Sequence, residues 1–376
     1  MFRRRNDLRR LALLIACTCS VAATAGDAGD GARLIAEFGL RESAEPVAAH
    51  PRWRRPRRIL VDSSYPGLID ALRAATPGIE WLPFDSLATL RQHVRQADAV
   101  FGRQALICDP EVLAAGRRLV WLATGSAGVE FCVAQPLLRK RQIVLTNMRA
   151  VAGPVIAEHA MAMLLALSRS LHVWIARQTH GDWNDDRGGA PLTTIAGKTL
   201  LVVGLGGIGI EVARRAHALG VRVIATRATA QPRPAEVEYV GGPDELDRLL
   251  GEADLVVNAL PLTPATRGLF DAARFARMKR GAIFVNVGRG GTVVTLDLVA
   301  ALQRGQLGGA GLDVTDPEPL PRDHPLWRAP NVIVTPHVAG DSDRGTAAQL
   351  QVLRENLRRY LAGGRLLSVV DLQRGY

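Results

Sequence analysis

A run of six residues, Gly204-Leu-Gly206-Gly-Ile-Gly209, constrains the possible fold of this chain more than any other feature. An apolar run at residues 199–203 precedes it, and a stretch compatible with a helix, residues 208–219, follows it. In this setting the first glycine permits a tight turn, the second leaves the backbone uncovered, and the third lets the helix pack closely on the strand. The sequence therefore predicts a strand, a tight turn and a helix that open a parallel sheet.

Short apolar runs alternate with helical stretches on both sides of this unit, which is typical of parallel α/β sheets. The first series of predicted strands comprises residues 59–61, 99–101, 119–122 and 143–145. The second series comprises residues 199–203, 221–225, 254–258, 282–287, 309–314 and 332–335. Helices are predicted at residues 68–75, 87–95 and 346–361, the last of which should return to the first domain. A length of 376 residues also favours two domains.

Residues 155–174 form an apolar stretch long enough to cross a membrane. Glu158, His159, Arg169 and Ser170 interrupt it. We therefore expect one long buried helix that joins the two domains, and no stable membrane span.

The N-terminal residues 1–25 combine an arginine-rich start, an apolar run and small residues typical of a cleavage site at Ala23-Thr-Ala25, as a secretory leader does. Export to the periplasm is the expectation, and a mis-assigned start on a cytoplasmic protein is the alternative. Residues 26–56 hold one short amphipathic stretch, at 34–40, and are expected to form a loosely attached lead-in.

The formal charge of +11 is concentrated in ten arginines at the N-terminus and just before the first strand. Such short clusters are usually solvated surface, so no nucleic-acid partner is expected. Of the four cysteines, Cys108 and Cys132 lie outside the leader and lack CxxC spacing. We expect both to be buried packing residues, with no disulfide framework and no metal site.

The glycine run also predicts a phosphate-binding site, because backbone amides at the start of a helix bind phosphate. Gly204, Gly206, Gly207, Ile208 and Gly209 are therefore predicted to hold the pyrophosphate of a nicotinamide dinucleotide.

The next strand lacks the carboxylate that normally receives the adenosine ribose, since Ala225-Thr226-Arg227 follows instead. Arg227, with hydroxyls of Thr226 and Thr229, can bind a 2′-phosphate, which predicts NADP(H) as the preferred cofactor and NAD(H) as a possible one. A solvent-facing arginine with relaxed cofactor use is the alternative.

Three polar residues follow later strands: Arg289, Glu318 and His337. A cation for a carboxylate, a histidine to move a proton and a carboxylate to hold that histidine are what oxidation of a 2-hydroxy acid needs.

From about residue 57 to the C-terminus the chain resembles the D-isomer-specific 2-hydroxyacid dehydrogenases, particularly the glyoxylate/hydroxypyruvate reductases. Nine motifs occur in the family's order: Thr124-Gly-Ser-Ala-Gly128, Thr146-Asn147, Ala157-Glu-His159, the glycine run, Leu260-Pro-Leu-Thr263, Asn286-Val-Gly-Arg289-Gly, Leu312-Asp-Val314, Glu318-Pro319 and Thr335-Pro-His337.

This resemblance implies an α/β protein of two domains and a homodimer. Residues 154–339 would form a Rossmann-type, doubly wound parallel sheet that binds NAD(P). Residues 57–153 and 340–376 would form a smaller, flavodoxin-like α/β substrate domain. A regulatory protein that senses NAD(P) on the same fold is the alternative to an enzyme.

The resemblance also implies roles for individual residues. Arg289 would bind the carboxylate of a small 2-keto or 2-hydroxy acid and polarise its keto oxygen, His337 would be the acid/base, and Glu318 would orient and charge that imidazole. Backbone amides of Ser126, Ala127 and Gly128 would receive the substrate carboxylate. Pro261 is placed on the cofactor side. Asp313, which lies inside a predicted strand, is expected to be a structural or cofactor-side residue and not the catalytic acid. Many relatives carry Arg-Ser where this chain has Gly102-Arg103, so the substrate contacts there are expected to differ.

Overall fold

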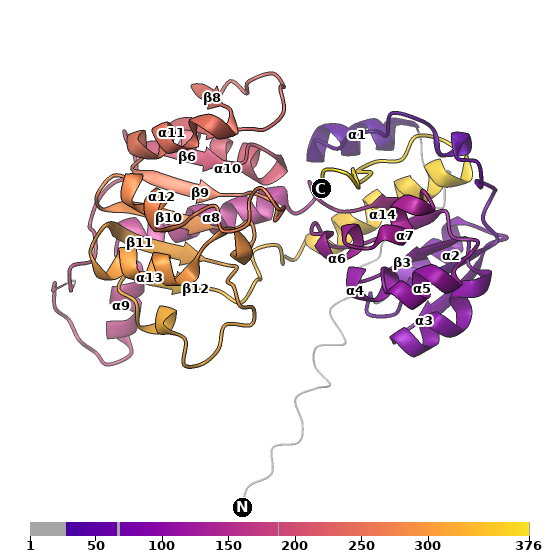
Figure 1. The fold of residues 1–376 in the computed structure, drawn as a ribbon, viewed down its shortest axis with the longest axis horizontal. Helices are drawn as coiled ribbons and strands as arrows, with labels where there is room; N and C mark the ends of the chain where they lie inside the picture. The colour runs from indigo at the N-terminus through magenta and orange to yellow at the C-terminus, as the bar shows by residue number, and fades with distance from the viewer. Residues whose placement is uncertain (1–27, 66–67, 187, 376) are drawn as a thin grey trace, which may run out of the picture.

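The computed structural model describes residues 28–65, 68–186 and 188–375. The described chain forms two lobes, each built on one parallel sheet with helices on both faces (Figure 1). This arrangement confirms the predicted α/β fold class.

The first lobe holds a five-stranded sheet in the order β2-β1-β3-β4-β5. All of its pairings are parallel, and this order is that of flavodoxin-like domains. The strands are β1 (Arg58–Asp62), β2 (Glu80–Phe84), β3 (Ala99–Phe101), β4 (Trp121–Ala123) and β5 (Val144–Thr146).

Apolar side chains cover both faces of this sheet. Along β1, Ile59 and Val61 enter one core while Leu60 enters the other, as expected from the alternation of side chains along a strand. The helices of the lobe are α1 (Ala28–Phe38), α2 (Leu68–Ala75), α3 (Leu87–His93), α4 (Gln104–Ile107), α5 (Pro110–Ala115), α6 (Glu130–Val133), α7 (Pro136–Lys140) and α14 (Gly345–Leu361).

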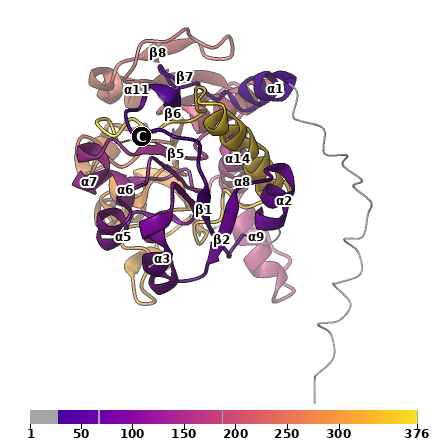
Figure 2. The same ribbon diagram turned by 90° about the vertical axis from the view of Figure 1, so that its right-hand side faces the viewer.

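The C-terminal helix α14 packs on the first sheet through Leu353, Leu357 and Tyr360. Helix α1 lies beside α14 (Figure 1, Figure 2), and Leu34 on α1 is buried in the same core. Leu40 and Val47 of the following segment are buried too. The expectation that the lead-in is loosely attached is therefore wrong, because its few apolar residues complete a core that α14 alone leaves open. The predicted leader, residues 1–25, lies outside the described residues.

The second lobe holds a seven-stranded parallel sheet in the order β12-β11-β10-β9-β6-β7-β8. All five residues of β6 are buried, with Leu200 and Val202 in one core and Leu201 and Val203 in the other. The strands are β6 (Thr199–Val203), β7 (Arg222–Thr226), β8 (Tyr239–Gly241), β9 (Leu255–Asn258), β10 (Ala282–Asn286), β11 (Leu307–Leu312) and β12 (Val332–Val334).

The helices of the second lobe are α8 (Gly153–Ser168), α9 (Leu171–Gln178), α10 (Gly207–Ala218), α11 (Leu246–Glu252), α12 (Ala272–Arg277) and α13 (Thr295–Gln303). The single helix predicted at 155–174 is wrong, because the chain breaks between α8 and α9. Ser170 takes a left-handed conformation there with φ of 55°, and its hydroxyl donates to the carbonyl of Pro191. Among the described residues, no helix is both long and apolar enough to cross a membrane.

Two edge strands were not predicted from the sequence. Strand β2 contains Pro83, which cannot donate to a strand ladder and is tolerated because β2 has a neighbour on one side only. Strand β8 is short and ends in glycine. Both give weak sequence signals because an edge strand needs few apolar residues.

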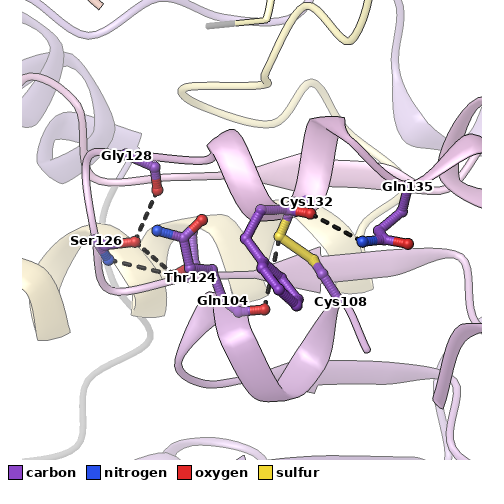
Figure 3. The surroundings of a disulfide bond; sticks show 8 residues. Gln104, Cys108, Thr124, Ser126, Gly128, Cys132 and Gln135 are labelled. Atoms are coloured by element: carbon purple, nitrogen blue, oxygen red, sulfur yellow. Dashed lines mark hydrogen bonds between the residues drawn. A yellow bond between two sulfur atoms is a disulfide. The ribbon is translucent and has the colours of Figure 1, made fainter. Parts of the chain in front are cut away.

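Cys108, at the end of α4, and Cys132, in α6, form a disulfide with their Cα atoms 5.0 Å apart. Both residues are buried as expected, but the expectation of unpaired cysteines is wrong. The bond joins positions 24 residues apart that only the packing of α4 against α6 brings together. Figure 3 shows the disulfide beside Gln104, with Thr124, Ser126 and Gly128 of the 124–128 turn on one side and Gln135 on the other.

Candidate active site

The glycine run has the geometry that its sequence predicts. Gly204 has φ of 98°, a value that favours glycine, and its amide donates to the carbonyl of Thr226 at the end of β7. A Cβ on Gly209 would lie 2.2 Å from the carbonyl oxygen of Gly204, so this position requires glycine. Gly206 precedes α10 and faces open space, so a phosphate can approach there.

This turn lies at the point where the order of the strands reverses. Strand β6 has β7 on one side and β9 on the other, and ligands of such sheets bind outside the carboxyl ends at this switch point. Gly207 and Ile208 begin α10 after β6, and half-buried Pro261 follows β9. The predicted pyrophosphate residues and Pro261 therefore lie at this switch point.

Arg289, Glu318 and His337 follow three adjacent strands, β10, β11 and β12, at their carboxyl ends. The structure thus brings the predicted catalytic residues to one edge of the sheet, the edge that also carries the glycine turn.

Buried amides hold the loop that carries Arg289. Asn258 Nδ2 donates to Asn286 Oδ1 at 3.0 Å and to Thr292 Oγ1 at 2.7 Å. The carbonyl of Arg289 then accepts from Asn286 Nδ2 at 3.1 Å and from Thr292 Oγ1 at 2.6 Å. The sequence reasoning missed Asn258 and Thr292, although a polar residue at the end of an apolar strand is a usable signal.

The guanidinium of Arg289 reaches across to the first lobe. Its Nε donates to Glu130 Oε1 at 2.7 Å, and its Nη1 donates to the carbonyl of Gly288 at 2.8 Å. A Cβ on Gly128 would lie 1.9 Å from Nη2, so a side chain there would displace the guanidinium from this position. Glu130 is a site residue that the sequence reasoning missed.

The turn of residues 124–128 is held by its own side chains. Ser126 Oγ donates to the carbonyl of Gly128 at 2.9 Å, and Asn147 Nδ2 donates to the carbonyl of Ala127 at 2.7 Å. The backbone amide of Ser126 donates to Thr124 Oγ1 at 3.3 Å. Among the described residues, the amides of Ala127 and Gly128 donate to no protein acceptor, which leaves them available to an anion beside Arg289.

His337 and Glu318 form a close pair, with 2.5 Å between Nδ1 and Oε1. Because a carboxylate can only accept, Nδ1 carries a proton and Nε2 is left for exchange with a ligand. Both side chains are partly exposed, 47% for His337 and 41% for Glu318. His337 has φ of 57°, a strained value for a residue with a side chain, and such strain occurs at functional sites.

Asp313 organises the loop that carries His337. Its buried carboxylate accepts from Thr335 Oγ1 at 2.6 Å and from the amides of Val338 at 2.9 Å and Ala339 at 3.0 Å. His159 Nε2 lies 3.0 Å from Thr335 Oγ1, so α8 supports the same cluster. These contacts give Asp313 a structural role in the loop of His337, and its contact with the cofactor stays a prediction.

Arg227 follows β7 and lines an open pocket of about 370 Å³ together with Thr229, Gln231 and Arg233. Its Nε donates to the carbonyl of Leu205 at 3.0 Å, which fixes the guanidinium beside the glycine turn. Thr226 is buried, and its backbone carbonyl anchors that turn.

The position that departs from the family carries a different ion pair. Arg103 Nε donates at 2.7 Å to the buried carboxylate of Asp62. Nearby, the hydroxyl of Tyr65 lies 2.5 Å from the position of a Cβ on Gly125. Arg103 therefore supports the loop after β1, and Tyr65 is a further residue beside the 124–128 turn that the sequence reasoning missed.

Comparisons with known proteins indicate one family. The family model described as the D-isomer specific 2-hydroxyacid dehydrogenase, NAD binding domain, matches residues 161–339. The glyoxylate/hydroxypyruvate reductase B of Salmonella newport is 39% identical over 227 residues, which are 60% of this chain and 70% of that protein.

Solved structures extend the similarity to both lobes. A D-isomer specific 2-hydroxyacid dehydrogenase family protein of Aeromonas salmonicida has a TM-score of 0.74 at 32% identity, over 84% of this chain and 99% of its own. The NADPH-dependent glyoxylate/hydroxypyruvate reductase of Sinorhizobium meliloti, solved with NADP and sulfate, has a TM-score of 0.73 at 30% identity, over 85% of this chain and 99% of its own. The predicted family is confirmed: the chain belongs to the D-isomer-specific 2-hydroxyacid dehydrogenases, NAD(P)-dependent oxidoreductases that act on the CH–OH group of 2-hydroxy acids.

Proposed function

We propose that the protein reduces small 2-keto acids, of the size of glyoxylate or hydroxypyruvate, with NADPH as the preferred cofactor. Where C2 becomes a stereocentre, the product is the D-2-hydroxy acid. The observation that carries the proposal is the convergence of Arg289 with the amides of Ala127 and Gly128 at the sheet edge that also presents the His337–Glu318 pair.

Each residue has a separate task in this reaction. Arg289 Nη2 and the two amides bind the substrate carboxylate, which fixes the keto carbon over the sheet edge. His337 Nε2 gives a proton to the keto oxygen. Glu318 stabilises the positive charge of the imidazolium before the transfer and holds the neutral ring in the same orientation afterwards. The nicotinamide, when bound, supplies the hydride.

Arg227 supports the preference for NADPH. It stands at the end of β7, where the adenosine ribose of a dinucleotide lies in this fold, and no carboxylate occupies that position. The Sinorhizobium meliloti relative is named NADPH-dependent. We propose that the guanidinium of Arg227 pairs with the 2′-phosphate.

A panel of 2-keto acids assayed with both nicotinamides tests the activity. We expect oxidation of NADPH with glyoxylate or hydroxypyruvate, and slower oxidation of NADH. Binding of NADPH without turnover on any acid would overturn the proposal in favour of a regulatory protein that senses the cofactor.

The variant Arg227→Asp tests the preference separately from the activity. A carboxylate there repels the 2′-phosphate and accepts from a 2′-hydroxyl, so we expect the ratio of kcat/KM for NADPH over NADH to fall by about 100-fold or more. An unchanged ratio would show that Arg227 does not select the cofactor.

We also propose that the chain is exported and forms a homodimer. The leader-like residues 1–25 and the Cys108–Cys132 disulfide support export, because disulfides persist in oxidising compartments. Cell fractionation with N-terminal sequencing tests it; a cytoplasmic protein with an intact leader and free thiols would contradict it. Light scattering of the purified protein tests the dimer, and a monomer mass would contradict it.

A further inference from the structure

The pocket that follows β7 contains two arginines that form no ion pair among the described residues. Arg227 and Arg233 line it, and their guanidinium groups donate to the backbone carbonyls of Leu205, Pro232 and Val237. Within the described chain, neither arginine forms an ion pair. Guanidinium groups held only by neutral oxygens in an open pocket are suited to bind an anion.

The single carboxylate among the described residues that line this pocket is already engaged. Both oxygens of Glu238 accept from Arg222, at 2.8 Å from Nη2 and 2.9 Å from Nε. Glu238 still acts on Arg233 through its charge, but its hydrogen bonds go to Arg222, so the guanidinium of Arg227 has no carboxylate partner among the described residues.

A third arginine reaches the pocket from the other lobe. Arg41 lies between α1 and the bridge that Glu42 forms with Leu367, so the first lobe fixes its backbone. Its Nη2 donates to the side-chain oxygen of Gln231, a residue that lines the pocket. The amide of Gln231 in turn lies 3.4 Å from Thr229 Oγ1.

The charges of Arg41 and Arg227 act on one another. Burial first, and then the nearby charge of Arg41, lower the pKa of Arg227. Two guanidinium groups that repel one another and bind neutral oxygens gain energy when an anion enters between them.

We propose that Arg41 is a binding residue for the 2′-phosphate of NADP(H), contributed by the substrate-side lobe to a site on the cofactor-binding lobe. This inference rests on the proposed preference for NADPH and adds a residue to it. NADP(H) thereby links the two lobes through its phosphate, whereas NAD(H), which has only a hydroxyl there, does not.

Kinetics of Arg41→Gln test the inference, with Arg55→Gln as the matched control. Arg55 is an exposed arginine of the same N-terminal segment as Arg41. Because it comes just before β1, it lies at the amino ends of the strands of the first sheet. Loss of one charge-assisted bond at an exposed site raises the KM for NADPH by about five- to tenfold. The KM for NADH stays within about twofold, and Arg55→Gln changes neither value.

Calorimetry with adenosine 2′,5′-bisphosphate and with 5′-AMP gives a readout independent of turnover. Arg41→Gln should weaken binding of the bisphosphate by the same factor and leave 5′-AMP unchanged. If Arg41→Gln binds NADPH and the bisphosphate like the wild type while Arg227→Asp does not, the inference is overturned and the cofactor preference stands. If neither variant weakens NADPH, both are overturned.

Discussion

Arg289 and Glu130 form an ion pair between the two lobes, with 2.7 Å between Nε and Oε1. Glu130 is the first residue of α6. It lies two residues after Gly128, the glycine beside the guanidinium of Arg289. The pair holds Nε away from the substrate side and leaves Nη2 beside the free amides of the 124–128 turn. Under the proposed function, Glu130 is therefore a positioning residue for Arg289.

Removal of that partner should weaken substrate binding more than turnover. In Glu130→Ala the arginine loses its restraint, so we expect the KM for the keto acid to rise about tenfold with kcat within about threefold. Glu130→Gln retains an acceptor oxygen and should restore most of the loss. Steady-state kinetics at saturating NADPH measure both, with Glu111→Ala, an exposed acid on α5, as the control. A constant or lower KM in Glu130→Ala would contradict this role.

The acid/base pair predicts the opposite kinetic pattern. His337→Asn removes the proton donor, so kcat should fall by about 10²- to 10⁴-fold while NADPH binding, measured by fluorescence titration, is kept. Glu318→Gln keeps a hydrogen-bonding side chain but loses the charge that stabilises the imidazolium, and a loss of about tenfold or more is expected. The control is His217→Asn, on an exposed position of α10. Turnover of His337→Asn close to that of the wild type would exclude the histidine as the acid.

Much of this site was predictable because its chemistry lies in short motifs that follow buried strands. An apolar run such as residues 199–203, followed by glycines, is typical of a strand buried on both faces. Arg289 comes three residues after the buried strand β10, and His337 comes three residues after the half-buried edge strand β12. The order of these strands along the chain therefore placed the catalytic residues at one edge.

The features that escaped prediction depend on contacts between distant segments. Glu130 meets Arg289 across 159 positions and Arg41 meets Gln231 across 190, and neither contact leaves a periodic pattern in the sequence. The disulfide and the break at Ser170 are set by packing, since no CxxC spacing, glycine or proline marks them.

The disulfide predicts a stability that depends on reductant. Closing a loop between positions 24 residues apart should contribute about 3 kcal/mol to the free energy of unfolding. Urea unfolding of the wild type should shift to lower urea with dithiothreitol present. The double variant Cys108→Ser/Cys132→Ser should unfold at the same urea concentration as the reduced wild type, and dithiothreitol should not change its midpoint. Equal midpoints for the oxidised wild type and the double variant would count against a bond in solution.

Asp98 predicts how stability changes in acid. Burial opposes ionisation of this carboxyl, but hydrogen bonds from the amide of Arg57, the side chain of Arg118 and the amide of Arg58 outweigh it and lower its pKa. A carboxyl with a lowered pKa in the folded state stabilises the fold above its unfolded pKa of about 4, and this contribution is lost as the pH falls through the folded value.

The variant Asp98→Asn should therefore cost about 3 kcal/mol at pH 7 and make stability less dependent on pH below about pH 4. Urea unfolding across pH 3 to 7 measures both effects. Parallel curves for the wild type and the variant would contradict the assignment.

The most direct test of the account follows one atom from the cofactor to the substrate. Hydroxypyruvate is incubated with the purified protein and NADPH that carries deuterium at the transferring position of C4, and the product is examined by mass spectrometry and chiral chromatography. We predict D-glycerate with one deuterium at C2 from the wild type, and at least 100-fold less of it in the same time from His337→Asn. L-glycerate, or cofactor that binds and keeps its deuterium, would contradict the account.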